Sequence, residues 1–204
     1  MRKRVSDLHE VLAPTRERLL RAARELIEEG GYGAASVIAI GERAGLAAGT
    51  LYRHFGSKEG LFVEVFRSVC DGEVRAIQSA AASMPHDASH VDRLETVLAT
   101  FAQRALRSPR LAWALIAEPV DPLVDAERLA YRERYSAITA DTLRRAIAAG
   151  ELPHQNVELT AAALVGGCGE ALVGPLSPLA GATPAVVEIL AALRTFIRRA
   201  VGAG

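Results

Sequence analysis

Apolar residues recur every three or four positions along most of the chain, which is the spacing of one face of an α-helix. In the segment 15–29, for example, Leu19, Ala23 and Leu26 fall on one face, and two glycines follow the last residue. β-Branched residues never alternate with polar ones over the length of a strand. The pattern therefore predicts an all-α protein.

Glycine, proline, serine and threonine divide this pattern into about nine segments. Ser36, Ser57 and Asn156 stand where helix N-caps belong, and Thr183-Pro184 precedes the last segment. No internal repeat is present. The predicted helices cover residues 15–29, 37–44, 48–55, 58–82, 90–106, 109–118, 122–149, 157–172 and 184–201.

Composition excludes several classes of protein. The 24 basic and 24 acidic residues cancel, which excludes a polycationic tail, and the 50% apolar content excludes a mostly disordered chain. Cys70 and Cys168 are too few for a disulfide scaffold and lack the close pairing of a zinc site. Glycines and prolines break the longest stretch without charges, 171–187, so no membrane span is predicted. Asp7, His9 and Glu10 stand where an export signal would have its apolar region, so no such signal is predicted either. We expect a cytoplasmic protein with no membrane partner.

Two short predicted helices, 37–44 and 48–55, are separated by a turn of three residues, 45–47. This is the arrangement of a helix-turn-helix, in which Gly45 supplies the positive φ of a tight reversal. The second helix of such a pair fits a major groove about 12 Å wide and meets base edges with its first side chains. Many all-α proteins also contain two short helices and a glycine, so the spacing alone leaves DNA binding open. The side chains expected to pack between the helices are Ile40, Ala44, Leu46, Leu51 and Phe55.

The residue identities around this turn are more specific than the spacing. Residues 45–61 read GLAAGTLYRHFGSKEGL, and Glu42-Arg43-Ala44 stands directly before them. Gly31-Tyr32 and Ser36-Val37 lie further upstream. Over residues 15–62 the chain resembles the TetR family of transcriptional regulators.

The resemblance implies two domains and a set of DNA contacts. Residues 1–58 would form the helix-turn-helix DNA-binding domain, and residues 59–204 a ligand-binding and dimerisation domain. Ser36 and Lys58 would bind phosphates at the starts of two helices. Tyr52 has a second interpretation, because an aromatic residue three positions before Phe55 is also suited to the core. The DNA-contacting positions implied are Ser36, Ala47, Ala48, Gly49, Thr50, Tyr52, Arg53, His54 and Lys58.

Three positions depart from the pattern of the family. The turn often ends in Ser or Thr and a polar or basic residue commonly follows, but here both are alanines, Ala47 and Ala48. Ile38 also stands where a polar or basic residue is frequent. The sequence therefore predicts few base contacts, such as those of Thr50 and of Ala48 with a thymine methyl group, or a contribution from DNA shape.

Charge is distributed unevenly between the two predicted domains. Residues 1–58 hold ten Lys/Arg and seven Asp/Glu, a net charge of +3, and residues 59–204 hold fourteen and seventeen, a net charge of −3. Phosphate binding thus has a modest electrostatic source at the N-terminal end. The Arg2-Lys3-Arg4 run is either a flexible arm that reaches the duplex or a solvated tail.

A single recognition helix covers one half-site, so a homodimer is expected. The last two predicted helices carry apolar faces rich in small residues, and pairing with a second copy would make a four-helix bundle, as the resemblance implies. A purely intrachain core is the alternative. The interface residues proposed on this basis are Ala161, Leu164, Val165, Cys168, Ala171, Leu172, Val186, Leu190, Leu193 and Ile197.

The helices between the two ends, over residues 58–149, are where members of the family enclose a small-molecule effector. A ligand that prefers one tilt of the helix 58–82 would move Lys58 and the recognition helices out of register with the groove. Ordinary core or surface roles are the alternative for each residue that could line such a pocket. The candidates are Phe66, Cys70, Trp113, Tyr131 and Tyr135.

No catalytic, metal or cofactor site is predicted. His86 and His90 fall in a proline-containing connection, and Cys168 has no histidine near it in the sequence. The function expected is that of a homodimeric, ligand-responsive DNA-binding regulator, a repressor that a small molecule releases from its double-stranded DNA operator. One alternative is an all-α small-molecule-binding protein or enzyme with a vestigial helix-turn-helix. Another is a module that binds a protein partner through its N-terminal helices.

Overall fold

The computed structural model describes residues 2–181 and 184–203, with side chains from residue 14 onward. Within these residues the chain forms nine α-helices and no strand, which confirms the predicted all-α class. The helices are α1 (Arg2–Gly30), α2 (Val37–Ala44), α3 (Thr50–Phe55), α4 (Lys58–Ala82), α5 (His90–Arg107), α6 (Pro109–Ile116), α7 (Pro122–Ala148), α8 (Val157–Leu176) and α9 (Val186–Val201).

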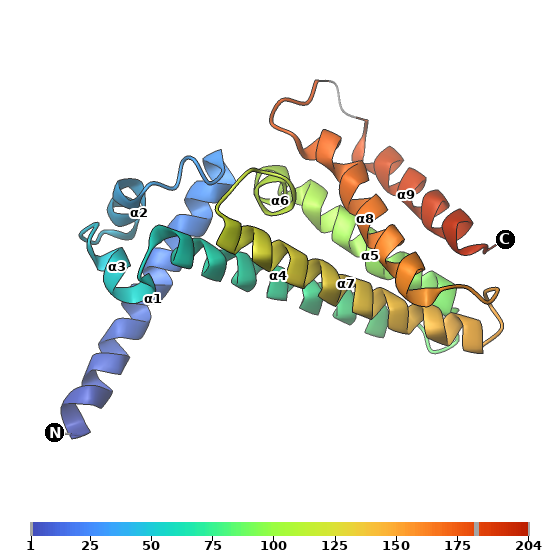
Figure 1. The fold of residues 1–204 in the computed structure, drawn as a ribbon, viewed down its shortest axis with the longest axis horizontal. Helices are drawn as coiled ribbons and strands as arrows, with labels where there is room; N and C mark the ends of the chain where they lie inside the picture. The colour runs from blue at the N-terminus through green and yellow to red at the C-terminus, as the bar shows by residue number, and fades with distance from the viewer. Residues whose placement is uncertain (1, 182–183, 204) are drawn as a thin grey trace.

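Helix α1 differs most from its prediction, because it begins at Arg2 and not near residue 15. The backbone of the basic run at residues 2–4 is helical, and an arm that reaches the duplex stays a prediction. The helix passes through Pro14, which removes one backbone hydrogen bond, and the helix formers between the basic run and Pro14 carry it on toward the N-terminus. Figure 1 shows this first half of α1 extending away from the rest of the molecule.

Several other helix boundaries also differ, and α6, for example, ends at Ile116 and not at residue 118. Helix α3 begins at Thr50 because residues 48 and 49 form a turn, in which the amides of Thr50 and Leu51 donate to the carbonyls three residues earlier. Helix α8 continues past residue 172 to Leu176 with Pro175 in its last turn. The predicted start of the last helix is Thr183-Pro184; Thr183 lies outside the described residues, and α9 begins two residues after Pro184, at Val186.

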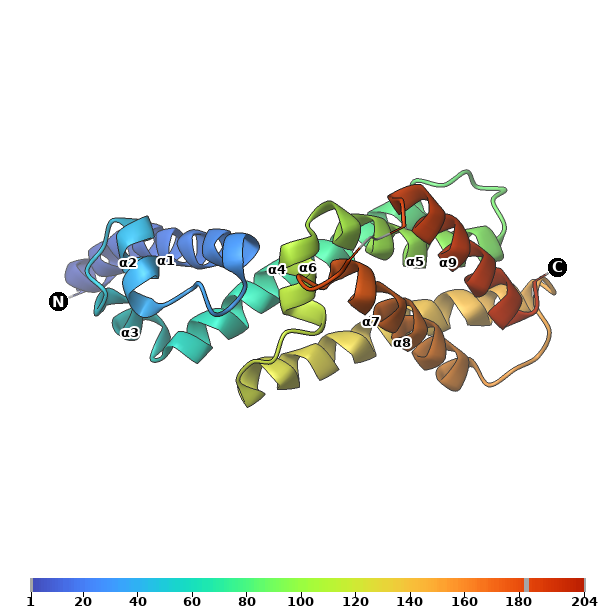
Figure 2. The same ribbon diagram turned by 90° about the horizontal axis from the view of Figure 1, so that it is seen from above.

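The helices form two packed regions that share α4, α6 and α7 (Figures 1 and 2). The first region joins α1, α2 and α3 to the start of α4, and Ile27, Ile40 and Leu51 are buried in its core. The second region holds α5, α8 and α9, with Leu94 and Leu164 among its buried side chains. Helix α4 thus runs from the small N-terminal region into the larger bundle.

The apolar faces of α8 and α9 turn inward more than the sequence suggested. Six of the ten residues assigned to a dimer interface are buried in the core of this chain, so they are core residues and that part of the prediction is wrong. Their helical faces lie against α5 and α7, and ion pairs from Arg194 and Arg198 to Glu95 hold α9 on α5. The six are Ala161, Leu164, Cys168, Leu172, Leu193 and Ile197, whereas Val165 and Leu190 are half-buried and Ala171 and Val186 are exposed.

Helix α8 is the one described helix whose length and mean hydropathy would allow it to cross a membrane. Its composition has a structural explanation, because Leu164, Cys168 and Leu172 pack into the core. The outward side carries alanines such as Ala163 and Ala171, which raise the mean hydropathy although they are exposed.

Candidate DNA-binding surface and ligand cavity

The turn between α2 and α3 depends on two glycines. Gly45 has φ of +62°, as predicted, and its amide donates to the carbonyl of Glu42. Gly41 lies inside α2, and a Cβ there would stand 3.0 Å from the carbonyl oxygen of Leu46 and 3.1 Å from Cα of Ala48. Sequence analysis missed Gly41; the signal was a glycine in the middle of a short helix, where only close packing explains it.

Two serines cap the helices that flank the recognition helix. The Ser36 hydroxyl accepts a 3.1 Å hydrogen bond from the amide of Ala39, and the Ser57 hydroxyl accepts a 2.9 Å bond from the amide of Gly60. Gly60 is required by packing, because a Cβ there would stand 2.5 Å from the carbonyl oxygen of Phe55. The start of α4 is therefore fixed closely against the end of α3.

The surface of α3 separates core side chains from outward-facing ones. Leu51 is 1% exposed, whereas Tyr52 is 53% exposed and Arg53 is also exposed. The core interpretation of Tyr52 is therefore excluded, and Phe55 is the aromatic residue that packs inward. The other positions that the sequence assigned to DNA binding are at the surface as well: Ser36, Ala47 and Gly49 are exposed, and Ala48, Thr50, His54 and Lys58 are half-buried.

Ile38 in α2 adds an apolar side chain to this surface, since it is 66% exposed. Together with Ala47 and Ala48 it makes a surface near the recognition helix that is poor in hydrogen-bonding groups. A Cβ at Gly49 would meet nothing within 4 Å, so the approach to the start of α3 is open. This arrangement suits contact with thymine methyl groups and with the sugar-phosphate backbone.

Several arginines near this surface are used within the protein. Arg18 of α1 donates to the carbonyl of Ala44 at 2.6 Å, and Arg43 makes two 2.8 Å hydrogen bonds to Glu29, which lower the pKa of that carboxyl. Lys58 differs, because its Nζ lies 5.4 Å from the centre of the Phe62 ring and has no acidic partner in the described part of the chain. Lys58 is thus available for a phosphate.

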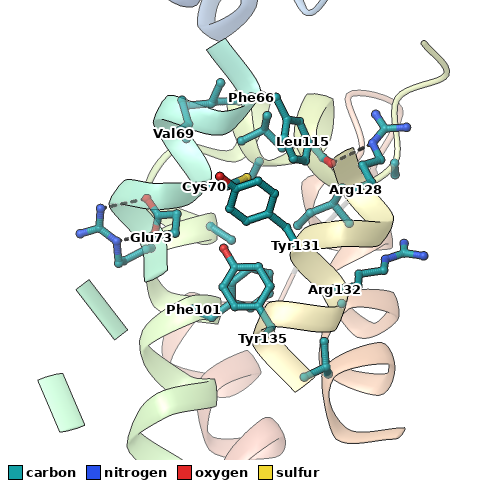
Figure 3. A pocket seen from close by; sticks show the side chains of 18 of the residues that line it. Phe66, Val69, Cys70, Glu73, Phe101, Leu115, Arg128, Tyr131, Arg132 and Tyr135 are labelled. Atoms are coloured by element: carbon teal, nitrogen blue, oxygen red, sulfur yellow. Dashed lines mark hydrogen bonds and ion pairs between the residues drawn. The ribbon is translucent and has the colours of Figure 1, made fainter. Parts of the chain in front are cut away.

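A cavity of about 1030 Å³ lies in the larger bundle, between α4, α5, α6, α7 and α8 (Figure 3). Four of the five residues expected to line a pocket lie on its wall. Trp113 does not, because it points from α6 into the second core, while its neighbours Leu111 and Ala112 face the cavity. The wall includes Phe66, Val69, Cys70, Glu73, Phe101, Arg104, Leu115, Arg128, Tyr131, Tyr135 and Gly166.

Two aromatic pairs dominate the wall of the cavity. The rings of Phe66 and Tyr131 are 5.6 Å apart between centroids, and so are those of Phe101 and Tyr135. Burial raises the pKa of the Cys70 thiol to about 12, so this side chain is neutral at physiological pH. The interior is therefore mainly apolar and aromatic, which suits an organic ligand.

Comparison with known proteins places this geometry in a family. Residues 19–65 match the family model described as bacterial regulatory proteins, tetR family. The chain is 31% identical over 155 residues to the HTH-type transcriptional regulator UidR of Escherichia coli (strain K12), a match that covers 74% of this chain and 76% of UidR. The chain belongs to the TetR family.

One further relative agrees with this assignment, and a solved structure shares the fold. The chain is 35% identical over 100 residues to the HTH-type transcriptional repressor KstR of Rhodococcus jostii (strain RHA1), which covers 49% of this chain and 45% of KstR. The fold resembles that of the transcriptional regulator FadR from Bacillus subtilis, solved in complex with stearoyl-CoA, with a TM-score of 0.71 and 20% identity over 91% of this chain and 97% of FadR. The TetR-family fold thus extends over both regions.

In this TetR-family protein, hydrogen bonds join the cavity wall to the DNA-binding region. Arg128 lies on the wall and donates to the carbonyls of Ala114 and Leu115, at 2.7 and 2.9 Å, and to that of Glu118. The Glu118 carboxylate in turn accepts the amide of Tyr32, at 3.1 Å, in the segment that leads from α1 to α2. Both residues were missed in the sequence, because their partners are backbone groups far away in the chain.

The same contact explains Gly31, whose φ is +75°. A Cβ at this position would stand 2.6 Å from both carboxylate oxygens of Glu118. Arg110 of α6 adds a 3.1 Å hydrogen bond to the carbonyl of Gly30. Arg110 in the first turn of α6 and Glu118 just beyond its last residue therefore contact three consecutive residues of the DNA-binding region, 30–32. In the described residues no group of three or more His, Cys, Asp or Glu side chains is placed to hold a metal ion.

Proposed function

We propose that the protein is a homodimeric repressor in the cytoplasm that leaves its DNA operator when a small molecule occupies the cavity. The observation that carries the proposal is the hydrogen-bonded link from Arg128 through Glu118 to Tyr32, because it joins the cavity wall to the helix-turn-helix. The function is that of a regulator rather than an enzyme. KstR, a relative, is named a transcriptional repressor, which supports repression as the direction of control.

DNA is read through the residues 36–58. Thr50, Tyr52 and His54 lie on or near the outer side of α3, where they contact base edges and phosphates in the major groove. Ser36 and Lys58 bind phosphates on either side of the groove. Because Ala47, Ala48 and Ile38 offer no hydrogen bonds, specificity rests on few base contacts, on thymine methyl groups and on DNA shape.

A second copy of the chain packs on the exposed side of α8 and α9. This side carries Leu159 and Val187, together with the exposed Ala163 and Ala171 of α8. Phe196 is 42% exposed and lies against Gly167, where a Cβ would meet its ring at 3.1 Å. Large exposed apolar side chains beside small residues suit close packing of two helix pairs, and the resulting twofold symmetry presents two copies of α3.

The effector is an organic molecule with a large apolar part. The cavity of about 1030 Å³ is at the upper end of the range for small-molecule sites, and aromatic pairs line it. FadR from Bacillus subtilis, which has the same fold, was solved with stearoyl-CoA. A ligand of comparable hydrophobicity fits the wall of this cavity better than a small polar metabolite does.

Release from DNA follows from a shift between two conformations. The ligand displaces the cavity-facing side chains of α4 and α6, namely Phe66 and Leu115. Movement of α4 carries Lys58, its first residue, and movement of α6 carries Glu118, which bonds the segment before α2. A coupling of about 1–3 kcal/mol would weaken operator binding about 5- to 150-fold.

The test is binding of the purified protein to the DNA upstream of its own coding region, measured by fluorescence anisotropy against a scrambled duplex of equal length. A preference for the upstream DNA that survives excess competitor and falls steeply with salt supports the regulator. Binding that is absent or insensitive to salt would favour a ligand-binding protein with a vestigial helix-turn-helix or a protein-interaction module.

A further inference from the structure

Two tyrosines one helical turn apart on α7 use their hydroxyl groups differently. The Tyr131 hydroxyl donates a 2.8 Å hydrogen bond to Oδ1 of Asp71 and also lies 3.2 Å from the carbonyl oxygen of Arg67. The Tyr135 hydroxyl makes no hydrogen bond to any residue that the structure describes. Both rings stand on the cavity wall (Figure 3). The same site therefore contains one hydroxyl that is hydrogen-bonded within the protein, that of Tyr131, and one that is not, that of Tyr135.

The free phenol lies inside the molecule and not at its rim. The Tyr135 ring packs against Phe101, and both rings also border a void of about 20 Å³ behind the cavity wall. Burial raises the pKa of Tyr135, so the group is a neutral phenol that can donate and accept a hydrogen bond. Figure 3 shows its oxygen directed toward the space between α7 and α4. A hydroxyl in this position leaves hydrogen-bonding capacity unused unless a ligand or water supplies a partner.

The charged groups of the wall favour a neutral partner. Arg104 is held by Glu73 through hydrogen bonds of 2.5 and 2.9 Å, and Arg128 is held by backbone carbonyls and by Asp125. The remaining charged residues of the wall, such as Arg132 and Glu133, are exposed to solvent. An ionised group placed deep in the cavity would therefore find the less exposed charges already paired, and its burial would be unfavourable. A hydroxyl or carbonyl oxygen carries no such penalty.

We propose that Tyr135 is the polar anchor of the cavity, and that the effector is an apolar molecule whose buried part carries a hydroxyl or carbonyl oxygen. This inference rests on the proposed ligand response and adds the chemistry of the ligand. Tyr135 determines specificity by bonding that oxygen, while Phe66, Phe101 and Tyr131 contact the apolar body. A ligand without the oxygen leaves the phenol unpaired and binds more weakly.

The experiment compares 2-naphthol with naphthalene, two probes that differ by one hydroxyl group. Dissociation constants are measured by calorimetric titration of the full chain, of Tyr135→Phe and of Tyr131→Phe. In the native protein 2-naphthol should bind more tightly, and Tyr135→Phe should reduce the ratio of the two constants about two- to tenfold. Tyr131→Phe should keep that ratio, whatever its effect on the two affinities, because its hydroxyl already bonds Asp71.

A second measurement needs no variant. In protein labelled with ¹³C at the tyrosine Cζ atoms, 2-naphthol should shift the resonance of Tyr135 more than naphthalene does, and the Tyr131 resonance should respond alike to both probes. An unchanged affinity ratio in Tyr135→Phe, an equal loss in Tyr131→Phe, or failure of both probes to bind would overturn the proposal. Because no DNA is present, these results are independent of whether the protein represses at an operator.

Discussion

The two functional regions of the molecule are built on different scales. The surface proposed to meet DNA comes from one continuous segment, residues 36–58, whose shape is set by turns, caps and glycines. The cavity is assembled from five helices spread over about a hundred residues, and its shape is set by which side chain meets which across the bundle. The first region is therefore specified locally, and the second by long-range packing.

This difference determines whether a substitution changes the fold or the binding of a ligand. In the DNA-binding region, backbone atoms lie so close that a Cβ added at Gly41 would stand 3.0–3.2 Å from main-chain atoms of Leu46 and Ala48. In the cavity, side chains face open space, so a substitution there changes the affinity for a ligand more than it changes the stability of the fold. The Arg128–Glu118–Tyr32 link is where the two regions depend on each other.

The largest effect is expected for Gly41→Val, which should disrupt the DNA-binding region alone. The added side chain meets Leu46 and Ala48 backbone atoms near 3 Å, so the variant should lose about 1–3 kcal/mol of unfolding free energy and at least tenfold in DNA affinity. Binding of 2-naphthol to the cavity should persist. Gly49→Ala is the matched control, since nothing lies within 4 Å of its Cβ, and its stability should stay within about 0.5 kcal/mol of the native protein. Equal losses in both variants would contradict the packing argument.

Next in size is Thr50→Val, which should change the order in which operator variants are bound. Thr50 is the first residue of α3, and a base contact there contributes about 1–3 kcal/mol of discrimination. Selection from a randomised duplex library, performed for the native and variant proteins, gives the comparison. The same preferred sequence in both would remove Thr50 from the readout.

Lys58→Ala should weaken binding to all DNA sequences by a similar factor. A phosphate contact carries no sequence information, so the slope of log affinity against log salt concentration should become shallower by about 0.9 for each phosphate lost. Measuring that slope on specific and scrambled duplexes tests the assignment. A loss confined to one sequence would mean that Lys58 contacts a base or positions another residue that contacts a base.

The smallest effect concerns the two thiols, which distinguish the cavity wall from the core. Burial raises the pKa of Cys70 to about 12 and that of Cys168 to about 11, so both should react slowly with iodoacetamide at pH 8 and faster as pH rises toward these values. Bound 2-naphthol should slow the labelling of Cys70 further and leave Cys168 unaffected, because only Cys70 lies on the cavity wall. Mass spectrometry of the labelled peptides measures the labelling rate of each thiol. Equal protection of Cys70 and Cys168 by 2-naphthol would contradict the placement of Cys70 on the cavity wall.

Sequence patterns predicted the locally specified region well. Helices α2 and α4 begin and end at the predicted residues, because Ser36 and Ser57 are strong caps and Gly45 can only end α2. The start of α3 was placed two residues early, since Ala48 and Gly49 carry no feature that separates a turn from a first helical turn. The exposure of Tyr52 was left open, because the sequence of a six-residue helix does not show which side of it the adjacent helices cover.

The long-range region could be predicted only in part. Helix α8 is apolar on both sides, so periodicity could not show that Leu164 and Leu172 face the core while Leu159 and Ala163 face outward. Trp113 was assigned to the pocket for its type, but its direction from α6 depends on how that helix packs. Glu118 carried no pattern at all, because its partner is a backbone amide 86 residues away.

Hydroxyl-radical footprinting of the full chain on the DNA upstream of its coding region tests the central claim most directly. The account predicts two protected patches on one face of the duplex, related by twofold symmetry and separated by whole helical turns, with protection lost when the cavity is filled by the effector. A single unsymmetrical patch, protection that spreads over any sequence, or no protection at all would contradict it.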